Sequence, residues 1–217
     1  MTTILTIEVT CGNCAAKSQQ AEMGSTNTMG APDLDLRPAP MKRQTMALWL
    51  EECPNCKLVC PQIAKPPAGA KAALEQPDYV VLVGDKKVHD LVRKFRAWAY
   101  VAENVGMPDD AGFAHLHAAW IADDVKDKEL ADLQRHVAAT HLAVARDRGT
   151  VYPRQKGAAE ALLADIHRRM GRWDEAIHEA ERGKSVTDQP FIDALCDYEI
   201  ALAKKHDADV HTTKEVP

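Results

Sequence analysis

The sequence is poor in aromatic side chains, which make up 5% of its 217 residues, and it has no apolar run of about 20 residues that could cross a membrane. Its N-terminus, MTTILTIEVT, lacks the basic start and continuous apolar stretch of a signal peptide. We therefore expect a cytoplasmic protein. Few aromatics combined with abundant alanine favour helices packed through small side chains over a β-sandwich.

Basic charge is not in excess either. The net charge is −5, residues 1–70 carry equal numbers of acidic and basic side chains, and the remainder carries the whole negative excess. A surface that binds nucleic-acid phosphates needs a basic excess. The charge balance therefore argues against a nucleic-acid partner.

Familiar catalytic motifs are also missing from the sequence. It contains no His-Glu-x-x-His, no Gly-x-Ser-x-Gly, no phosphate-binding loop and no dinucleotide fingerprint. We expect a protein that is not an enzyme, with thiol redox chemistry as the one activity left open.

What the sequence does have is paired cysteines. Cys11 and Cys14 in TCGNC, and Cys53 and Cys56 in ECPNC, form two Cys-x-x-Cys motifs, each after an apparent strand. In a reducing compartment such pairs are more often metal ligands or redox centres than disulfides. Two such knuckles are typical of a zinc ribbon, in which four thiolates surround one Zn²⁺. The sequence therefore predicts a metal site at these four cysteines.

The composition of residues 1–66 supports a structural role for that metal. The segment has too few large apolar side chains for an independent core. A structural Zn²⁺ site supplies roughly 10–16 kcal/mol of apparent binding free energy at neutral pH. Four thiolate ligands leave no position for water, so we expect a structural and not a hydrolytic zinc ion.

Other interpretations of the cysteines remain open. Cys60 is most simply a core-facing thiol, but it can also replace Cys56 as a ligand or bind a second metal. Cys196 is expected to be a small apolar filler. The motifs CGNC and CPNC also occur as dithiol redox centres, in which a helix N-terminus after the active thiol lowers its pKa. The residues after Cys14 can form such a helical turn.

The chain divides into two parts with different periodicity. Residues 1–66 are expected to form a zinc-ribbon-like module with strands at 4–9, 45–52 and 57–64. Between the first two strands, Gly and Pro predict a long loop over 24–43. A linker is expected at 67–87, where YVVLV is ambiguous between strand and helix. A helical domain over 88–206 and a disordered tail over 207–217 complete the prediction.

Helical periodicity dominates the second part. Apolar residues recur at spacings of three and four, and they predict six helices joined by short turns, a pattern of antiparallel hairpins. The expected helices cover residues 88–105, 109–123, 127–147, 155–170, 173–184 and 190–205.

One helical junction is more specific. ALLADIHRRMGRWDEAIHEAERG, residues 161–183, looks like a tetratricopeptide helix–turn–helix, with Gly171 at the turn and Trp173 and Ala176 between its helices. Ala164 and His167 depart from that pattern. A generic helical bundle is the alternative.

The long loop APDLDLRPAPMKR is rigid and charged. Arg37 and Arg43 are possible docking residues for an anion or a partner protein. The alternative is that the charged residues of this loop pair with one another and hold the loop against the ribbon.

Four segments, TCGNC, GSTNTMGAPDLDLRP, MKRQTMALWLEECPNC and HAAWIADD, together resemble an uncharacterised bacterial family. Its members join an N-terminal zinc-ribbon-like segment to a tetratricopeptide-like helical region. The resemblance implies a metal at the four cysteines and no established activity. This sequence departs from the family at Lys57, where glycine is common, and in its additional Cys60.

These observations predict a mainly α protein in which a small β zinc-ribbon-like module precedes a tetratricopeptide-like array of helical hairpins. We expect a non-enzymatic Zn²⁺-binding protein that acts as a scaffold for a protein partner. The rival functions are a nucleic-acid-binding zinc ribbon and a thiol–disulfide oxidoreductase.

Overall fold

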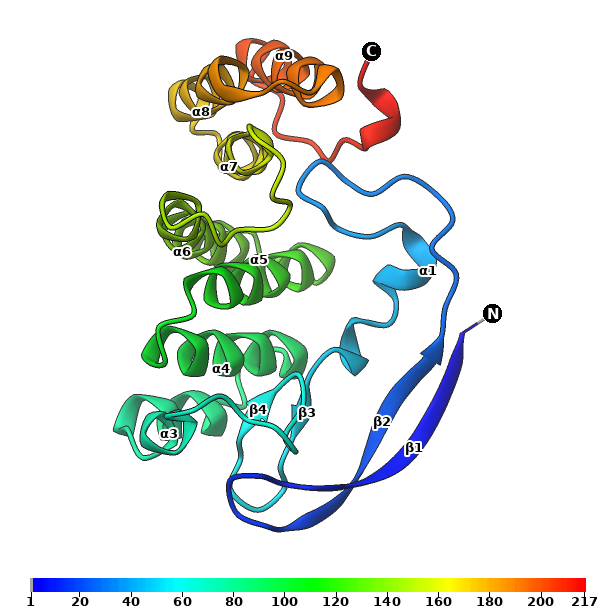
Figure 1. Ribbon diagram of the computed structural model, residues 1–217, viewed down its shortest axis with the longest axis vertical. Coiled ribbons are helices and arrows are strands. Elements are labelled where there is room, and N and C mark those ends of the chain that lie inside the picture. The colour runs from blue at the N-terminus through cyan, green and yellow to red at the C-terminus, as the bar shows by residue number, and fades with distance from the viewer. Residues whose placement is uncertain (1) are drawn as a thin grey trace.

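The computed structural model describes residues 2–217 and is mainly helical (Figure 1). The expected mainly α fold is confirmed, and the long helices lie within a few residues of their predicted bounds. They are α4 (Asp90–Asn104), α5 (Pro108–Asp124), α6 (Lys128–Asp147), α7 (Ala158–Arg169), α8 (Trp173–Val186) and α9 (Pro190–Lys204).

Consecutive helices stack on one another along the length of the molecule (Figure 1). Small residues dominate their contacts, and alanines such as Ala99, Ala118 and Ala138 are fully buried. At Gly112 the approach is so close that a Cβ atom would lie 2.7 Å from Leu142 Cγ. Small side chains, and not aromatic ones, thus fill the space between the helices and let them approach closely.

The turns between helices use the expected residues. Gly171 has a φ of +72° directly after α7, a conformation that glycine adopts without strain. Ala176 in α8 is fully buried, and the Trp173 ring stacks on His206 at 5.1 Å. Residues 161–183 thus form a helical hairpin, which is the coarse feature that the sequence predicted there.

The N-terminal part contains two β-hairpins. The first pairs β1 (Thr3–Thr10) with β2 (Lys17–Ser25) in an antiparallel register that joins Thr10 to Lys17. The strand expected at 4–9 is confirmed. The helical turn considered after Cys14 is wrong, because this segment is β2. Most residues of β2 are exposed, so its polar sequence lacks the alternation of apolar and polar residues that predicts a strand.

The strand expected at 45–52 is mostly wrong. The structure has a 3₁₀ turn, η1 (Met46–Leu48), and a strand of two residues, β3 (Glu51–Glu52). The Trp49 indole N–H donates to Thr45 Oγ1 across this turn, and the Trp49 ring packs edge-on against His117 of α5. Burial of Trp49 against the helices outweighs the strand preference of the sequence. β4 (Val59–Cys60) pairs with β3 and is the core of the third expected strand.

Residues 26–50, here called the connecting segment, run along the stacked helices from the first hairpin to β3 (Figure 1). The segment is irregular over most of the predicted loop, but it contains one short helix, α1 (Pro40–Arg43). Leu34 packs with Ala161 and Leu195, and the Trp120 indole N–H donates to Asp35 Oδ2 at 2.6 Å. Much of this loop is therefore part of the core.

The structure differs from the expected disordered tail. Residues 207–217 contain the 3₁₀ turn η2 (Thr213–Glu215), and their backbone pairs with the connecting segment. The Leu34 amide donates to the His211 carbonyl, and the Thr213 amide donates to the Pro32 carbonyl. A capping box formed by Thr212 and Glu215 caps the N-terminus of η2. The tail is therefore ordered by its contacts with the connecting segment, which lies far away in the sequence.

Residues 67–87, expected to be a linker, form α2 (Ala70–Leu74) and α3 (Pro77–Gly84). Ala70, Ala73 and Tyr79 are buried in a core that continues from the cysteine knuckles into the helices. The ambiguous YVVLV segment is helical. Among the described residues, no helix combines the length and apolar character required to cross a membrane.

Candidate metal centre

Each Cys-x-x-Cys motif forms the turn of a β-hairpin. Cys11 and Cys14 lie between β1 and β2, and Cys53 and Cys56 lie between β3 and β4. The two hairpins are distant in sequence but meet at their turns. All four Sγ atoms lie within 4.8 Å of one another, so the structure brings together the complete set of cysteines that the sequence singled out.

The two knuckles share one backbone pattern. The Cys11 amide donates to the Ala16 carbonyl and the Ala15 amide to the Cys11 carbonyl, both at 2.9 Å. In the second knuckle the Cys53 amide donates to Leu58 and the Lys57 amide to Cys53, at 2.9 and 3.0 Å. Each turn is therefore closed by the same two backbone hydrogen bonds at its first cysteine.

The residue after each knuckle has a left-handed backbone. Ala15 has a φ of +59° and Lys57 a φ of +61°. This conformation is strained for any residue with a Cβ atom and favours glycine, so a glycine would fit both positions without strain. Lys57 is therefore compatible with the knuckle, at a local cost.

The sulfur separations match tetrahedral coordination. Cys11 Sγ lies 3.8 Å from Cys56 Sγ, and Cys14 Sγ lies 3.6 Å from Cys53 Sγ. Four ligands around Zn²⁺ at about 2.3 Å require sulfur separations of about 3.8 Å. The distances are far too long for disulfides, whose sulfurs are about 2.05 Å apart, and all six cysteines are free. The geometry fits one metal ion held by four thiolates.

The surroundings of the thiols differ. Burial raises the pKa of Cys53 to about 12 and also raises the pKa of Cys11. A hydrogen bond from the Asn55 side chain and one from the Ala16 amide lower the pKa of Cys14 to about 6. Two buried thiols with raised pKa values therefore lie against a third whose pKa is lowered, and a bound cation would favour the thiolate form of the buried pair.

The first knuckle is also held against the chain after β4. The Gly12 amide donates to the Ile63 carbonyl at 2.8 Å, and a Cβ atom at Gly12 would lie 2.7 Å from the Ala64 carbonyl oxygen. Only glycine allows this approach. The same loop is fixed by Glu51, whose carboxylate accepts the Ile63 amide at 2.7 Å.

Tyr79 links the second knuckle to the helices. Its hydroxyl donates to the Lys57 carbonyl at 2.8 Å and accepts the Val59 amide at 3.2 Å. The side chain is buried, and burial raises the pKa of its hydroxyl. No sequence motif marks this residue, because Tyr79 stands in an apolar run with no polar pattern around it.

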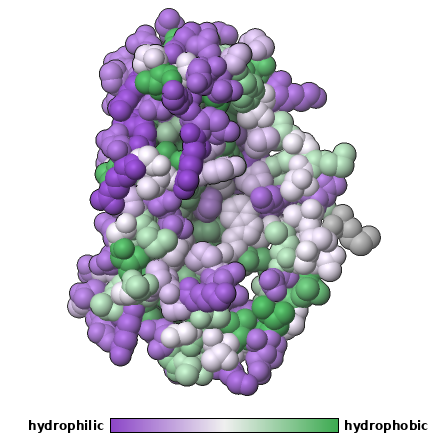
Figure 2. Space-filling model, viewed as in Figure 1, coloured by the Kyte–Doolittle hydropathy of each residue, from purple (hydrophilic) through white to green (hydrophobic). Residues whose placement is uncertain are grey.

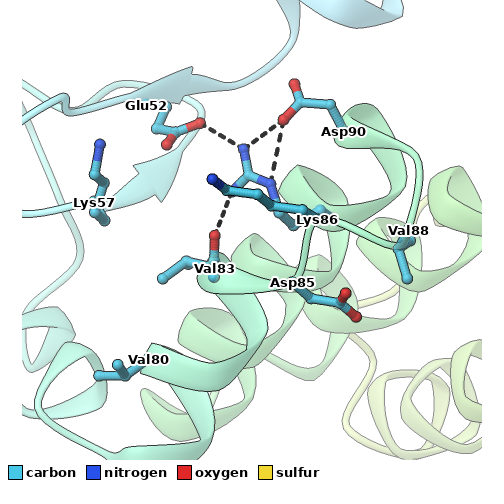
Figure 3. Close-up of a pocket in the computed structure, with 10 residues that line it drawn as sticks. Glu52, Lys57, Val80, Val83, Asp85, Lys86, Val88 and Asp90 are labelled. Carbon is cyan, nitrogen blue, oxygen red and sulfur yellow. Dashed lines mark hydrogen bonds and ion pairs between the residues drawn. The ribbon is translucent and has the colours of Figure 1, made fainter.

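Arg93 of α4 forms a second link between the module and the helices, and dashed lines in Figure 3 mark its bonds to the labelled Glu52 and Asp90. Its guanidinium donates to Glu52 of β3 at 2.9 Å and to Asp90 at 2.6 Å. These groups border a cavity of about 560 Å³ next to the second knuckle, whose rim includes Lys57 and Lys86. Glu52 and Asp90 are both paired with Arg93, so these two carboxylates are engaged within the chain.

The remaining cysteines are separate from the cluster. Cys60 is buried in β4, and burial raises its pKa to about 12. Cys196 is buried in α9, where its Sγ would lie 2.8 Å from a Cβ atom at Gly183. Among residues 2–217, the cluster of cysteines close enough to share a metal ion contains Cys56 and not Cys60.

The two arginines predicted as docking residues are engaged within the chain. Arg37 is paired with Asp124 of α5, and its guanidinium lies over the Trp120 ring. Arg43 donates to Asp33 at 2.7 Å and to the Pro38 carbonyl at 2.9 Å. Arg43 pairs within its own loop, as the alternative interpretation expected, whereas Arg37 holds the loop against the helices and not against the ribbon.

Each Cys-x-x-Cys motif is followed by a strand, β2 or β4. The helix N-terminus that lowers the pKa of the active thiol in dithiol redox centres does not follow either motif within residues 2–217. No protein-family model, no curated protein and no solved structure matches this chain.

Proposed function

We propose that this chain is a non-enzymatic zinc-binding protein whose metal site is structural and whose helices form a scaffold for a protein partner. The observation that carries the metal assignment is the separation of the four sulfurs, 3.6 and 3.8 Å across the two hairpins. Thiolate ligands at this spacing favour Zn²⁺ over the hard cations, which prefer oxygen.

A structural role follows from the number and position of the ligands. Cys11, Cys14, Cys53 and Cys56 would occupy all four tetrahedral positions, which leaves none for water or substrate. The ligands come from two hairpin turns, so metal binding would lock those turns together. Val9, Leu58 and Ile63 around them are buried, which keeps solvent away from the thiolates.

The scaffold assignment rests on the stacked helices. Arrays of helical hairpins present extended surfaces suited to peptides and protein segments, and residues 161–183 resemble the tetratricopeptide hairpin in sequence. The connecting segment already lies against α5, α7 and α9. A partner would therefore bind the helical surfaces that this segment leaves uncovered.

Elemental analysis of the purified chain tests the metal assignment. We expect one zinc ion per chain in the natural protein and in Cys60→Ser, and loss of that zinc in Cys14→Ser and in Cys56→Ser. Zinc retained in Cys56→Ser but lost in Cys60→Ser would assign the fourth ligand to Cys60. A metal-free folded natural protein would refute the structural zinc site.

Two further measurements separate the scaffold from its rivals. A scaffold should recover a protein at defined stoichiometry from a lysate, with binding that depends little on salt. Binding to DNA or RNA that weakens steeply with salt would favour the nucleic-acid ribbon. Turnover of a disulfide substrate that is lost in Cys14→Ser would favour the oxidoreductase.

A further inference from the structure

The β1–β2 hairpin extends from the metal end as a two-stranded ribbon at one edge of the molecule (Figure 1). Most of its side chains are exposed, and the face that carries Ile7 and Val9 is covered near the knuckle. Ile4 is 58% exposed and Leu5 is 50% exposed, and apolar surface is visible over this hairpin at the lower right of Figure 2. Isolated two-stranded hairpins are marginally stable in water, so a ribbon of this kind gains from a further strand.

The hydrogen-bonding groups of β1 alternate between its two edges. The Cys11 amide donates to Ala16 across the hairpin, so Val9, Ile7 and Leu5 direct their backbone groups toward β2. Glu8, Thr6 and Ile4 therefore direct theirs outward. Among residues 2–217, no strand pairs with this outer edge.

The outer edge of β1 also lacks the usual protection against strand pairing. It has no proline and no lysine, and its one irregularity lies at its start, between Thr3 and Ile4. Its one charge, Glu8, is paired with Lys17 of β2 at 3.0 Å. The edge is thus extended and locally neutral.

We propose that this edge pairs antiparallel with the same edge of a second copy of the chain, with Thr6 on the two-fold axis. Val9 is buried and Ile7 is partly buried, and before Val9 the outward-directed residues are Ile4, Thr6 and Glu8, of which Thr6 is the central one. A two-fold axis there makes Thr6 of each copy exchange both backbone hydrogen bonds, and it pairs Ile4 with Glu8 of the other copy.

The side chains are compatible with this register. Leu5 of one copy lies opposite Ile7 of the other, so both such pairs are apolar and lie on one face. No charged residue meets a like charge, because Glu8 faces Ile4 and keeps its own partner, Lys17. Two hairpins joined in this way form a continuous sheet of four strands, with a small interface and correspondingly modest affinity.

Sedimentation or light scattering of the zinc-loaded chain tests the proposal. We expect twice the chain mass at high micromolar concentration. Leu5→Lys places an ammonium group opposite Ile7 and should weaken association by about tenfold or more. Leu133→Lys is the matched control, because Leu133 is similarly exposed, at 53%, but lies on α6. Its dimer should be unchanged.

Cross-linking tests the register. Thr6→Cys puts two cysteines at Cα atoms about 5.5 Å apart, within disulfide range, so the dimer should cross-link on mild oxidation. Glu8→Cys is the control, because its two copies would be separated by more than about 13 Å along the strands.

A chain that remains monomeric at high micromolar concentration overturns the proposal. It is equally overturned by a dimer that Leu5→Lys does not weaken, which would place the interface elsewhere. Cross-linking of Glu8→Cys but not of Thr6→Cys would refute the register. A peptide or partner strand bound at this edge in place of the second copy would also count against it. Zinc content reports separately on the metal site.

Discussion

The two parts of this molecule are stabilised in different ways. In the helical array, small side chains let helices approach closely, and alanines such as Ala97, Ala118 and Ala138 are completely buried. In the N-terminal module, short strands and irregular segments surround four cysteines with few large apolar groups. The helical array is thus stabilised mainly by close packing, and under the proposed function a metal bound at the four cysteines adds to the smaller core of the module.

The two parts nevertheless share a boundary. Leu58, Val59 and Ile63 of the module belong to the same buried cluster as Phe95 of α4. The Tyr79 hydroxyl and the Arg93–Glu52 pair cross the same boundary. Damage to the knuckles should therefore reach α2, α3 and α4 first, because these contacts lie beside the cysteines, and should reach α6 least.

Removal of the metal should produce the largest difference between the two parts. Cys53→Ser or chelation should remove most of the roughly 10–16 kcal/mol that a structural zinc site contributes. Hydrogen exchange should become fast in β1–β4, faster than normal in α2–α4, and nearly unchanged in α6. Hydrogen exchange read by mass spectrometry on peptides provides this regional measurement.

Cys60→Ala is the control, because it removes a buried thiol that is not in the cluster. It should retain one zinc ion and slow exchange in both parts. Slow hydrogen exchange of β1–β4 in the metal-free chain would show that packing keeps the module folded without a metal.

A change within the array should act through packing alone. Gly112→Ala places a Cβ atom 2.7 Å from Leu142 Cγ and should lower the free energy of unfolding by about 1–3 kcal/mol. Gly84→Ala is the matched control, since nothing lies within 4 Å of a Cβ atom there, and it should be neutral or stabilising by up to about 1 kcal/mol. Urea denaturation measures both. Zinc content should not change in either variant, and equal effects would contradict close packing at Gly112.

A buried ionic cluster in the array should make its stability depend on pH. Arg168 donates to both Asp165 and Glu199, and all three side chains are buried. The other oxygen of each carboxyl, Asp165 Oδ2 and Glu199 Oε1, has no partner apart from the opposite carboxyl. Burial and the charge of Asp165 raise the pKa of Glu199 well above its usual value.

Because folding raises this pKa, the folded chain binds more protons than the unfolded chain. The contribution of Glu199 to stability is thus complete below the ordinary value of 4.5 and falls as pH rises toward its folded pKa. Glu199→Gln cannot ionise, and its amide can donate to Asp165, so it should be more stable than the natural chain at neutral pH by about 1 kcal/mol. Urea midpoints at acidic and neutral pH should diverge for this variant.

The exposed Glu175→Gln serves as the control for that experiment. Its difference from the natural chain should be small at both pH values. A Glu199→Gln variant that is less stable than the natural chain at neutral pH would indicate that Glu199 is ionised in the folded protein.

The smallest effect should come from backbone strain in the second knuckle. Lys57 has a φ of +61°, so Lys57→Gly should stabilise the module by up to about 1 kcal/mol. Lys57→Val, which is β-branched, should destabilise it. The thermal midpoint of the zinc-loaded chain measures both changes. If the glycine variant is the less stable of the two, the left-handed backbone at this position is not a source of strain.

Local sequence was a good guide wherever structure follows from short-range patterns. The long helices follow the three-to-four spacing of residues such as Val92, Phe95 and Ala99, which requires no knowledge of the rest of the chain. The metal site was predictable for a related reason. A Cys-x-x-Cys turn brings its own two sulfurs together, and two such turns imply one shared ion.

Errors arose where a distant contact decides the local conformation. Trp49 ends an apolar run that reads as a strand, but it packs against Phe95 and His117, and the backbone turns to place it there. β2 is polar and was missed because its pairing with β1 forms through the knuckle. The C-terminal tail is ordered by backbone hydrogen bonds to Pro32 and Leu34. The sequence of the tail alone cannot predict these distant partners.

The sequence by itself thus determined the helices, the four metal-binding candidates and the close packing of small residues, because each depends on neighbours within a few positions. Only the tertiary structure decided that Arg37 is buried against Asp124, that Tyr79 supports the second knuckle, and that β1 has a free outer edge. These features depend on which surfaces meet after the chain has folded. A local pattern carries no information about its distant partner.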